Sequence, residues 1–260
     1  MLPRGTLRLR IGDVWIDAVT FEGALASIAG LVAAGRGGAV FTPNVDHVVN
    51  AGRHPKLREA YAAASLSLVD GQPLVWASRL LGVPLPAKIS GSDLVPRLLD
   101  QALALRHRVF LMGGAPGVAD EAAELLRKRG VEVVGCDGGR FSSDPAPGEE
   151  AELVAKINAV RPHLVLVALG SPKQEVWVHR IRDQIIPAVS VAIGASLDFL
   201  TGRVKRAPRW MQSAGLEWMH RLAQDPKRLA WRYFVNDPQI LIVLARTLRL
   251  PRAERISAAR

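Results

Sequence analysis

Short apolar runs alternate with longer segments of mixed polarity along most of the chain. Runs such as Gly38–Phe41 have the length of buried strands, whereas segments such as Val118–Arg129 repeat apolar residues at helical spacing. Strands that alternate with helices are typical of a Rossmann-like α/β fold, a mainly parallel sheet with helices on both faces. The pattern predicts strands over 38–41, 66–69, 108–112, 131–134, 164–169 and 188–193. It predicts helices over 21–31, 46–64, 92–105, 118–129, 149–160 and 172–184.

The alternation stops after Gly202, and the last part of the chain differs in charge. Residues 203–260 contain 13 Lys or Arg against 4 Asp or Glu, which is nearly all of the net charge of +10. They also contain Trp210, Trp218 and Trp231, half of the six tryptophans. We therefore expect an α/β domain over 1–202 and a basic helical appendage over 203–260. Such a charge asymmetry predicts an anionic partner, either nucleic acid or a membrane surface.

The composition sets the class of protein and its compartment. Hydrophobic residues make up 49% of the 260 residues and charged residues 22%, as in folded soluble proteins. Cys136 is the single cysteine, so no internal disulfide framework is possible and a reducing compartment is indicated. The first residues lack the apolar segment of a signal peptide, and no apolar run is long enough to span a bilayer. We expect a cytoplasmic protein.

Asp70 ends an apolar run in the segment LSLVDGQPLVW, residues 66–76. Asp followed by Gly71 is a common turn former, which would explain the acid without any function. Alternatively, Asp70 is a catalytic base at the carboxyl edge of the sheet, where open α/β folds bind their ligands. The segment by itself leaves both interpretations open.

Two further loops have the chemistry of a phosphate site. Gly113 and Gly114 open a glycine-rich turn between a strand and a helix, where backbone N–H groups can approach phosphate oxygens. This turn matches neither the dinucleotide fingerprint nor the P-loop, and it can equally be a tight structural turn. The loop Gly170–Glu175 offers Lys173 and Gln174 to a base, sugar or phosphate.

Metal and acyl-transfer chemistry have little support in the sequence. The six histidines are scattered without metal-ligand spacing, and neither an Asp-x-Asp motif nor a Gly-x-Ser-x-Gly elbow is present. We therefore expect no metal ion and no cofactor. The pattern fits a nucleotide-sugar enzyme and also a nucleic-acid-binding protein that uses the basic appendage.

Several motifs, taken in order, point to a known family. They are Thr42-Pro43-Asn44, Val69-Asp70-Gly71, Ile89-Ser90-Gly91-Ser92-Asp93-Leu94, Gly113-Gly114, Gly170-Ser171-Pro172-Lys173-Gln174-Glu175, Gly194-Ala195-Ser196-Leu197-Asp198-Phe199, Lys205-Arg206-Ala207-Pro208 and Gly215-Leu216-Glu217-Trp218. In this order and spacing they resemble the WecG/TagA/CpsF family of glycosyltransferases (glycosyltransferase family 26), over about residues 10–235.

The resemblance implies an inverting hexosyltransferase that needs no metal and in which Asp70 is the catalytic base. It would move a sugar of the N-acetylmannosamine, N-acetylmannosaminuronic acid or glucose class from a UDP-sugar to a polyprenyl-diphosphate-linked sugar. Such a reaction serves exopolysaccharide and other cell-surface polysaccharide biosynthesis, at the inner face of the membrane. The expected partners are these two substrates, an anionic membrane surface and, as in relatives that self-associate, a second copy of the chain.

The resemblance also implies substrate-binding residues. They are Thr42 and Asn44 near the base, Lys88 where the family usually has Arg, Gly113 and Gly114, Gln174 and Asp198 on the donor side, and Arg221, Arg228 and Arg232 for a diphosphate. Paired arginines usual in the family are replaced here by Trp231-Arg232. The alternative is a non-enzymatic nucleic-acid-binding protein. Because no base-reading or stacking module is recognisable, we expect no nucleic acid partner.

Overall fold

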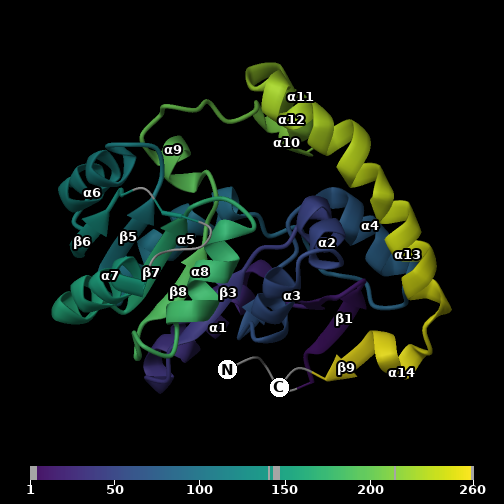
Figure 1. The fold of residues 1–260 in the computed structure, drawn as a ribbon, viewed down its shortest axis with the longest axis horizontal. Helices are drawn as coiled ribbons and strands as arrows, with labels where there is room; N and C mark the ends of the chain where they lie inside the picture. The colour runs from purple at the N-terminus through teal and green to yellow at the C-terminus, as the bar shows by residue number, and fades with distance from the viewer. Residues whose placement is uncertain (1–4, 140, 143–146, 214, 259–260) are drawn as a thin grey trace.

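A six-stranded parallel sheet forms the centre of the protein, with the strand order β4-β3-β8-β7-β5-β6 (Figure 1). The computed structural model describes residues 5–139, 141–142, 147–213 and 215–258, without the side chains of Pro147, Arg209, Ser213 and Arg228. The strands of this sheet are β3 (Gly38–Phe41), β4 (Leu66–Ser67), β5 (Val109–Gly113), β6 (Val133–Asp137), β7 (Leu164–Ala168) and β8 (Val189–Ala192).

Helices surround the sheet and continue into the last part of the chain. Those around the sheet are α1 (Phe21–Ala34), α2 (Val45–Ala51), α3 (Pro55–Ala62), α4 (Gln72–Leu80), α5 (Gly91–Ala104), α6 (Val118–Lys128), α7 (Pro147–Val160), α8 (Lys173–Ile181) and α9 (Ser196–Leu200). The later ones are α10 (Arg209–Ser213), α11 (Glu217–Gln224), α12 (Pro226–Trp231), the π-helical turn η1 (Arg232–Asn236), the 3₁₀ turn η2 (Asp237–Gln239), α13 (Ile240–Arg249) and α14 (Arg252–Arg255).

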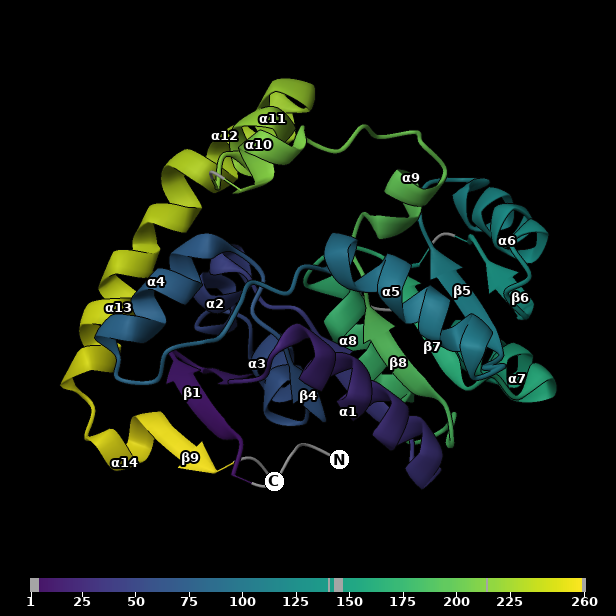
Figure 2. The same ribbon diagram turned by 180° about the vertical axis from the view of Figure 1, so that it is seen from behind.

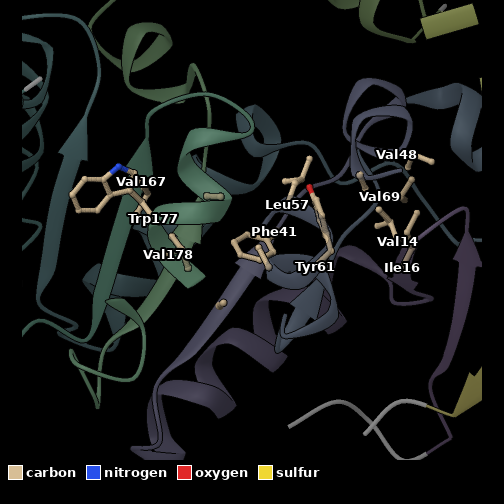
Figure 3. Close-up of a cluster of buried hydrophobic side chains, with 14 of the residues drawn as sticks. Val14, Ile16, Phe41, Val48, Leu57, Tyr61, Val69, Val167, Trp177 and Val178 are labelled. Atoms are coloured by element: carbon tan, nitrogen blue, oxygen red, sulfur yellow. The ribbon is translucent and has the colours of Figure 1, made fainter. Parts of the chain in front are cut away.

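Successive residues of each buried strand pack on opposite faces of the sheet. Val165 and Val167 of β7 belong to one cluster of buried side chains, together with residues of α3, α7 and α8. Leu164 and Leu166 belong to the other cluster, with residues of α1, α5 and α6. Figure 3 shows part of the first cluster, where Trp177 of α8 lies next to Val167. Burial on both faces explains why these strands are continuous apolar runs.

The predicted α/β class and parallel sheet are confirmed, and most predicted elements agree with the structure. The helix predicted over 46–64 is wrong in one respect, because the structure has two helices, α2 and α3. Gly52 ends α2, and Pro55 begins α3 at a position where the missing N–H of proline is tolerated. The apolar pattern continues across this break and therefore hides it.

A second, antiparallel sheet joins the two ends of the chain. It has the order β2-β1-β9 and consists of β1 (Leu7–Ile11), β2 (Val14–Asp17) and β9 (Ile256–Ala258). Leu9 pairs with Ile16 on one side and with Ile256 on the other. The sequence predicted only helices after Gly202, so β9 corrects that prediction. The division into 1–202 and 203–260 stays a prediction. Strand β9 belongs to the second part but completes a sheet formed by β1 and β2 of the first part.

The last long helix is fastened to the core beside this small sheet. In Figures 1 and 2 the chain from α9 arches over one end of the molecule, and α13 then descends along one side. Helix α13 packs against β1 and α2. The hydroxyl of Thr247 accepts a 3.0 Å hydrogen bond from the backbone N–H of Gly12. Asn236 adds a link to α2, since its amide donates to Asp46 at 2.7 Å.

Candidate active site

A cavity of about 1290 Å³ lies at the carboxyl ends of the central strands. Loops after β3, β4, β5, β7 and β8 border it, together with α11 and η1 from the last part of the chain. The first turns of α2, α5 and α8 also border it, and the partial positive charge of such helix ends favours anionic ligands. Eight of the predicted site residues line this cavity: Thr42, Asn44, Asp70, Gly114, Gln174, Asp198, Arg221 and Arg232.

A smaller cavity of about 360 Å³ adjoins the first. The two cavities share Asn44, Asp70, Arg221, Arg232 and Tyr233 as walls. The other walls of the smaller cavity are largely apolar and include Val45, Pro73, Trp218, Phe234 and Ile240. Asp70 is the one carboxylate among the five shared residues. It therefore borders both the larger and the smaller cavity.

The surroundings of Asp70 favour its use as a proton acceptor. Its backbone N–H donates to the carbonyl oxygen of Pro43 at 2.8 Å, which holds it beside the loop after β3. Burial raises the pKa of the Asp70 carboxyl above its ordinary value, while the charges of Arg221 and Lys88 act in the opposite direction. A carboxylate with a raised pKa is a better proton acceptor than an exposed one.

Asn44 links the start of α2 to the last part of the chain. Its side-chain oxygen caps α2 by accepting from the backbone N–H of His47 at 3.3 Å. The same oxygen accepts a hydrogen bond from the guanidinium of Arg232 at 3.1 Å. Arg232 thereby reaches a residue of the motif Thr42-Pro43-Asn44, although 188 positions separate the two in sequence.

Gln174 lines the larger cavity, but both ends of its amide are engaged within the protein. Its nitrogen donates to Glu175 at 2.7 Å, and its oxygen accepts from the backbone N–H of Gly194 at 3.0 Å. The side chain therefore fixes the loop after β8 to the start of α8. A direct contact between Gln174 and a donor substrate stays a prediction, as does that of Asp198.

Lys88 lies in an ion-pair network at the smaller cavity. Its ammonium is 3.6 Å from a carboxylate oxygen of Glu217 and 3.8 Å from one of Asp93. Arg206 contacts Asp93 at 2.5 Å, and Arg221 contacts Glu217 at 2.9 Å. These five side chains join the segment before α5 to α11, so the lysine that replaces the usual arginine has two carboxylate partners.

Two predicted site residues are not placed in either cavity. Gly113 is buried at the end of β5 and lines neither of them, although its neighbour Gly114 lines the larger one. Arg228 belongs to α12, but its side chain lies outside the described part of the structure.

Comparison with known proteins identifies the family. The model of the "Glycosyl transferase WecG/TagA/CpsF family" matches residues 9–254. The chain belongs to this family. It is also 35% identical, over 206 residues, to an N-acetylglucosaminyldiphosphoundecaprenol N-acetyl-beta-D-mannosaminyltransferase of Bacillus spizizenii. That alignment covers 78% of this chain and 77% of the relative.

The sequence did not single out three polar residues that border the cavities of this glycosyltransferase. His47 and Tyr233 border the larger cavity, and Glu217 borders the smaller one. His47 lies one helical turn beyond Asn44, and this spacing was the available signal. A search for metal-ligand spacing among the histidines does not detect this signal. Among the described residues, no three of the His, Cys, Asp or Glu side chains form a cluster that could hold a metal ion.

Gly113→Ala should destabilise the fold by about 3 kcal/mol, the combined scale of overpacking and backbone strain. An added Cβ would lie 2.6 Å from the carbonyl oxygen of Ala168 and 2.5 Å from Leu169, at a φ of +92°. Denaturant unfolding measures the loss. Gly170→Ala is the matched control, because its φ is +71° and its Cβ would meet nothing within 4 Å. Equal losses in both variants would contradict the close approach at Gly113.

Proposed function

We propose that this protein transfers an N-acetylmannosamine-type sugar from a UDP-sugar to a polyprenyl-diphosphate-linked sugar, with inversion at the anomeric carbon. The observation that carries the proposal is the position of Asp70 in the wall between two cavities of different character. The name of the relative in Bacillus spizizenii describes a diphosphoundecaprenol-linked acceptor and a beta-mannosaminyl product. Both descriptions are compatible with a polar cavity that adjoins an apolar one.

Asp70 acts as the general base in this proposal. Its carboxylate takes the proton of the acceptor hydroxyl while the hydroxyl oxygen forms a bond to the anomeric carbon of the donor sugar. The bond from that carbon to the UDP oxygen breaks, and UDP leaves with the electron pair. Attack from the face opposite UDP inverts the anomeric centre.

The two substrates are assigned to the two cavities. The larger cavity exceeds the roughly 300–1,000 Å³ of an ordinary ligand pocket, so it has room for a sugar nucleotide and an acceptor sugar. The apolar walls of the smaller cavity suit the first part of a polyprenyl chain. Arg221 and Arg232 border both cavities and can neutralise a diphosphate between them.

The leaving UDP would be stabilised without a metal ion. Developing charge on a leaving diphosphate can be balanced by basic side chains and by backbone N–H groups. Lys173 and Arg203 border the larger cavity, and so do the first turns of α2, α5 and α8. Metal independence is part of the proposal, and addition of a chelator to the transfer assay tests it.

We further propose that the last helices attach the enzyme to the cytoplasmic face of the membrane. Among the described residues, no helix combines the length and the hydropathy needed to cross a bilayer. Large apolar side chains are nevertheless exposed on α12, η1 and α13: Trp231, Phe234, Val235, Leu241, Ile242 and Leu248. Arg246 and Arg249 follow on the last turns of α13. Exposed apolar and basic side chains together favour an anionic lipid surface.

The double substitution Trp231→Ser and Leu241→Ser should weaken binding to anionic vesicles at least tenfold. Each of these side chains is 70% exposed, and burying a large apolar side chain contributes about 1.5–3 kcal/mol. Vesicle co-sedimentation at low salt measures the change. Leu105→Ser, at an exposed position after α5, serves as the control and should bind normally. Unchanged binding by the double variant would exclude this face as the attachment surface.

Release of UDP tests the transferase proposal directly. The full-length protein is incubated with UDP-N-acetylmannosamine and a short-chain polyprenyl-diphosphate N-acetylglucosamine, with and without a chelator. We expect acceptor-dependent release of UDP and a beta-linked product, unaffected by the chelator. Absence of transfer with every UDP-sugar would refute the proposed donor. Loss of activity with the chelator, restored by magnesium or manganese, would refute metal independence alone.

A further inference from the structure

His47 is held in a fixed orientation at the wall of the larger cavity. It belongs to the first turn of α2, and only 6% of its surface is exposed. Its Nδ1 atom is 2.6 Å from the hydroxyl oxygen of Tyr61 and 3.7 Å from a carboxylate oxygen of Glu175. The imidazole therefore has two buried polar neighbours on one edge, and it borders the cavity that contains Asp70.

Glu175 is a buried carboxylate with few partners. None of its surface is exposed, and one oxygen accepts from Gln174 at 2.7 Å. The other oxygen has no hydrogen-bond partner among the described residues. A buried carboxylate is costly unless a cation or several donors face it. Within the described part of the chain, His47 is the basic side chain at ion-pair distance from Glu175.

Tyr61 fixes the ring of His47 from the protein interior. Its side chain is completely buried and lies beside Phe41 and Leu57, as Figure 3 shows. Burial raises the pKa of Tyr61 well above its ordinary value, with the Glu175 carboxylate as a further cause, so the hydroxyl keeps its proton. Its hydrogen bond with Nδ1 orients the imidazole, and Nε2 has no hydrogen-bond partner among the described residues.

We infer that His47 is a substrate-positioning residue whose Nε2–H donates a hydrogen bond to an oxygen of the bound substrate in the larger cavity. The inference rests on the proposed transferase function and adds a residue to it. The oxygen belongs either to the UDP-sugar or to the acceptor sugar, and both offer the same chemistry. Tyr61 and Glu175 support the imidazole from behind in this arrangement.

A pair of substitutions separates this role from a purely structural one. His47→Gln places an amide nitrogen near the position of Nε2, whereas His47→Asn places its polar atoms near Nδ1 and withdraws from the cavity. We expect His47→Asn to raise the KM of one substrate by about tenfold or more, the worth of a hydrogen bond to a charged or strongly polar group. His47→Gln should restore the KM to within about threefold. A structural role through Tyr61 alone predicts the opposite order.

Steady-state kinetics with each substrate varied in turn identify the oxygen that His47 contacts. A raised KM for the UDP-sugar assigns it to the donor, and a raised KM for the lipid-linked sugar assigns it to the acceptor. The thermal midpoint of each variant shows whether the fold is retained, and calorimetry shows whether the affinity for UDP changes with the KM of the donor. Tyr61→Phe should raise the same KM less than His47→Asn does, because the ring loses only its orienting partner.

The kinetic results distinguish a failure of the inference about His47 from a failure of the proposed transferase function. If the unaltered protein transfers sugar and His47→Asn does so with an unchanged KM for both substrates, the inference is wrong and the proposed function stands. If the unaltered protein neither binds UDP nor transfers sugar, the proposed function is wrong and the role of His47 falls with it.

Discussion

Asp70→Asn should lower the turnover number by about two to four powers of ten, the usual contribution of a general base. The amide has the size of the carboxyl but cannot accept the proton of the acceptor hydroxyl. Initial rates of UDP release with saturating donor and acceptor measure the effect. UDP affinity should be retained, because the substitution leaves the basic walls of the cavity in place.

The stability of this variant provides an internal check. Because burial raises the pKa of Asp70 above its ordinary value in the folded protein, ionising this carboxyl costs more free energy in the folded state than in the unfolded state. Removing the charge should therefore leave the thermal midpoint unchanged or higher at pH 7.5, and the difference should vanish in acid. Asp225→Asn removes another carboxylate from the same cavity and should keep turnover within a few-fold. Near-normal turnover in Asp70→Asn would disprove the assigned role.

Arg221→Gln should reduce kcat/KM for the lipid-linked acceptor by about 10- to 100-fold, the range of a lost charge-assisted hydrogen bond. Arg221 borders both cavities, and its positive charge lowers the pKa of Asp70. Without that charge the pKa of Asp70 rises further. The acid limb of the pH–rate profile should consequently move to higher pH, because more of the base is protonated at a given pH.

Arg249→Gln is the control for this prediction. It removes the same charge from an exposed position on α13, away from both cavities. Its pH profile should be that of the unaltered protein. An equal loss in both variants would mean that the overall charge of the last helices matters rather than the position of Arg221. An unshifted acid limb in Arg221→Gln would contradict its electrostatic effect on Asp70.

The main sheet could be predicted because its strands are buried on both faces. Such strands have a recognisable local sequence pattern, an apolar run bounded by turn residues, as in Leu164–Ala168. The strands of the small sheet have a weaker sequence pattern. Leu7–Ile11 alternates apolar and basic residues, but its partner β9 is only three residues long and lies at the other end of the chain. No local pattern specifies a pairing over that distance.

The candidate site was predictable at the strand ends and less so elsewhere. Asp70 and Asn44 lie in the loops after β4 and β3, within a few residues of the strand ends, so the carboxyl edge of the sheet places them together. Arg221 and Arg232 were expected near a diphosphate from the resemblance, and both border the shared wall. The roles of Gln174 and His47 depend on contacts within the fold, with Gly194 and Glu175 for Gln174 and with Tyr61 for His47. Sequence spacing does not reveal such contacts.

The pairing of β1 with β9 has a consequence for synthesis of the protein on the ribosome. Leu9 is synthesised before its partner Ile256, and the whole stretch of chain between them is made in the meantime. At 5–20 residues per second the nascent chain would carry an unpaired β1 edge for roughly ten to fifty seconds. Unpaired strand edges are templates for aggregation until they are covered. The hairpin of β1 and β2 therefore has one uncovered edge until β9 has been synthesised.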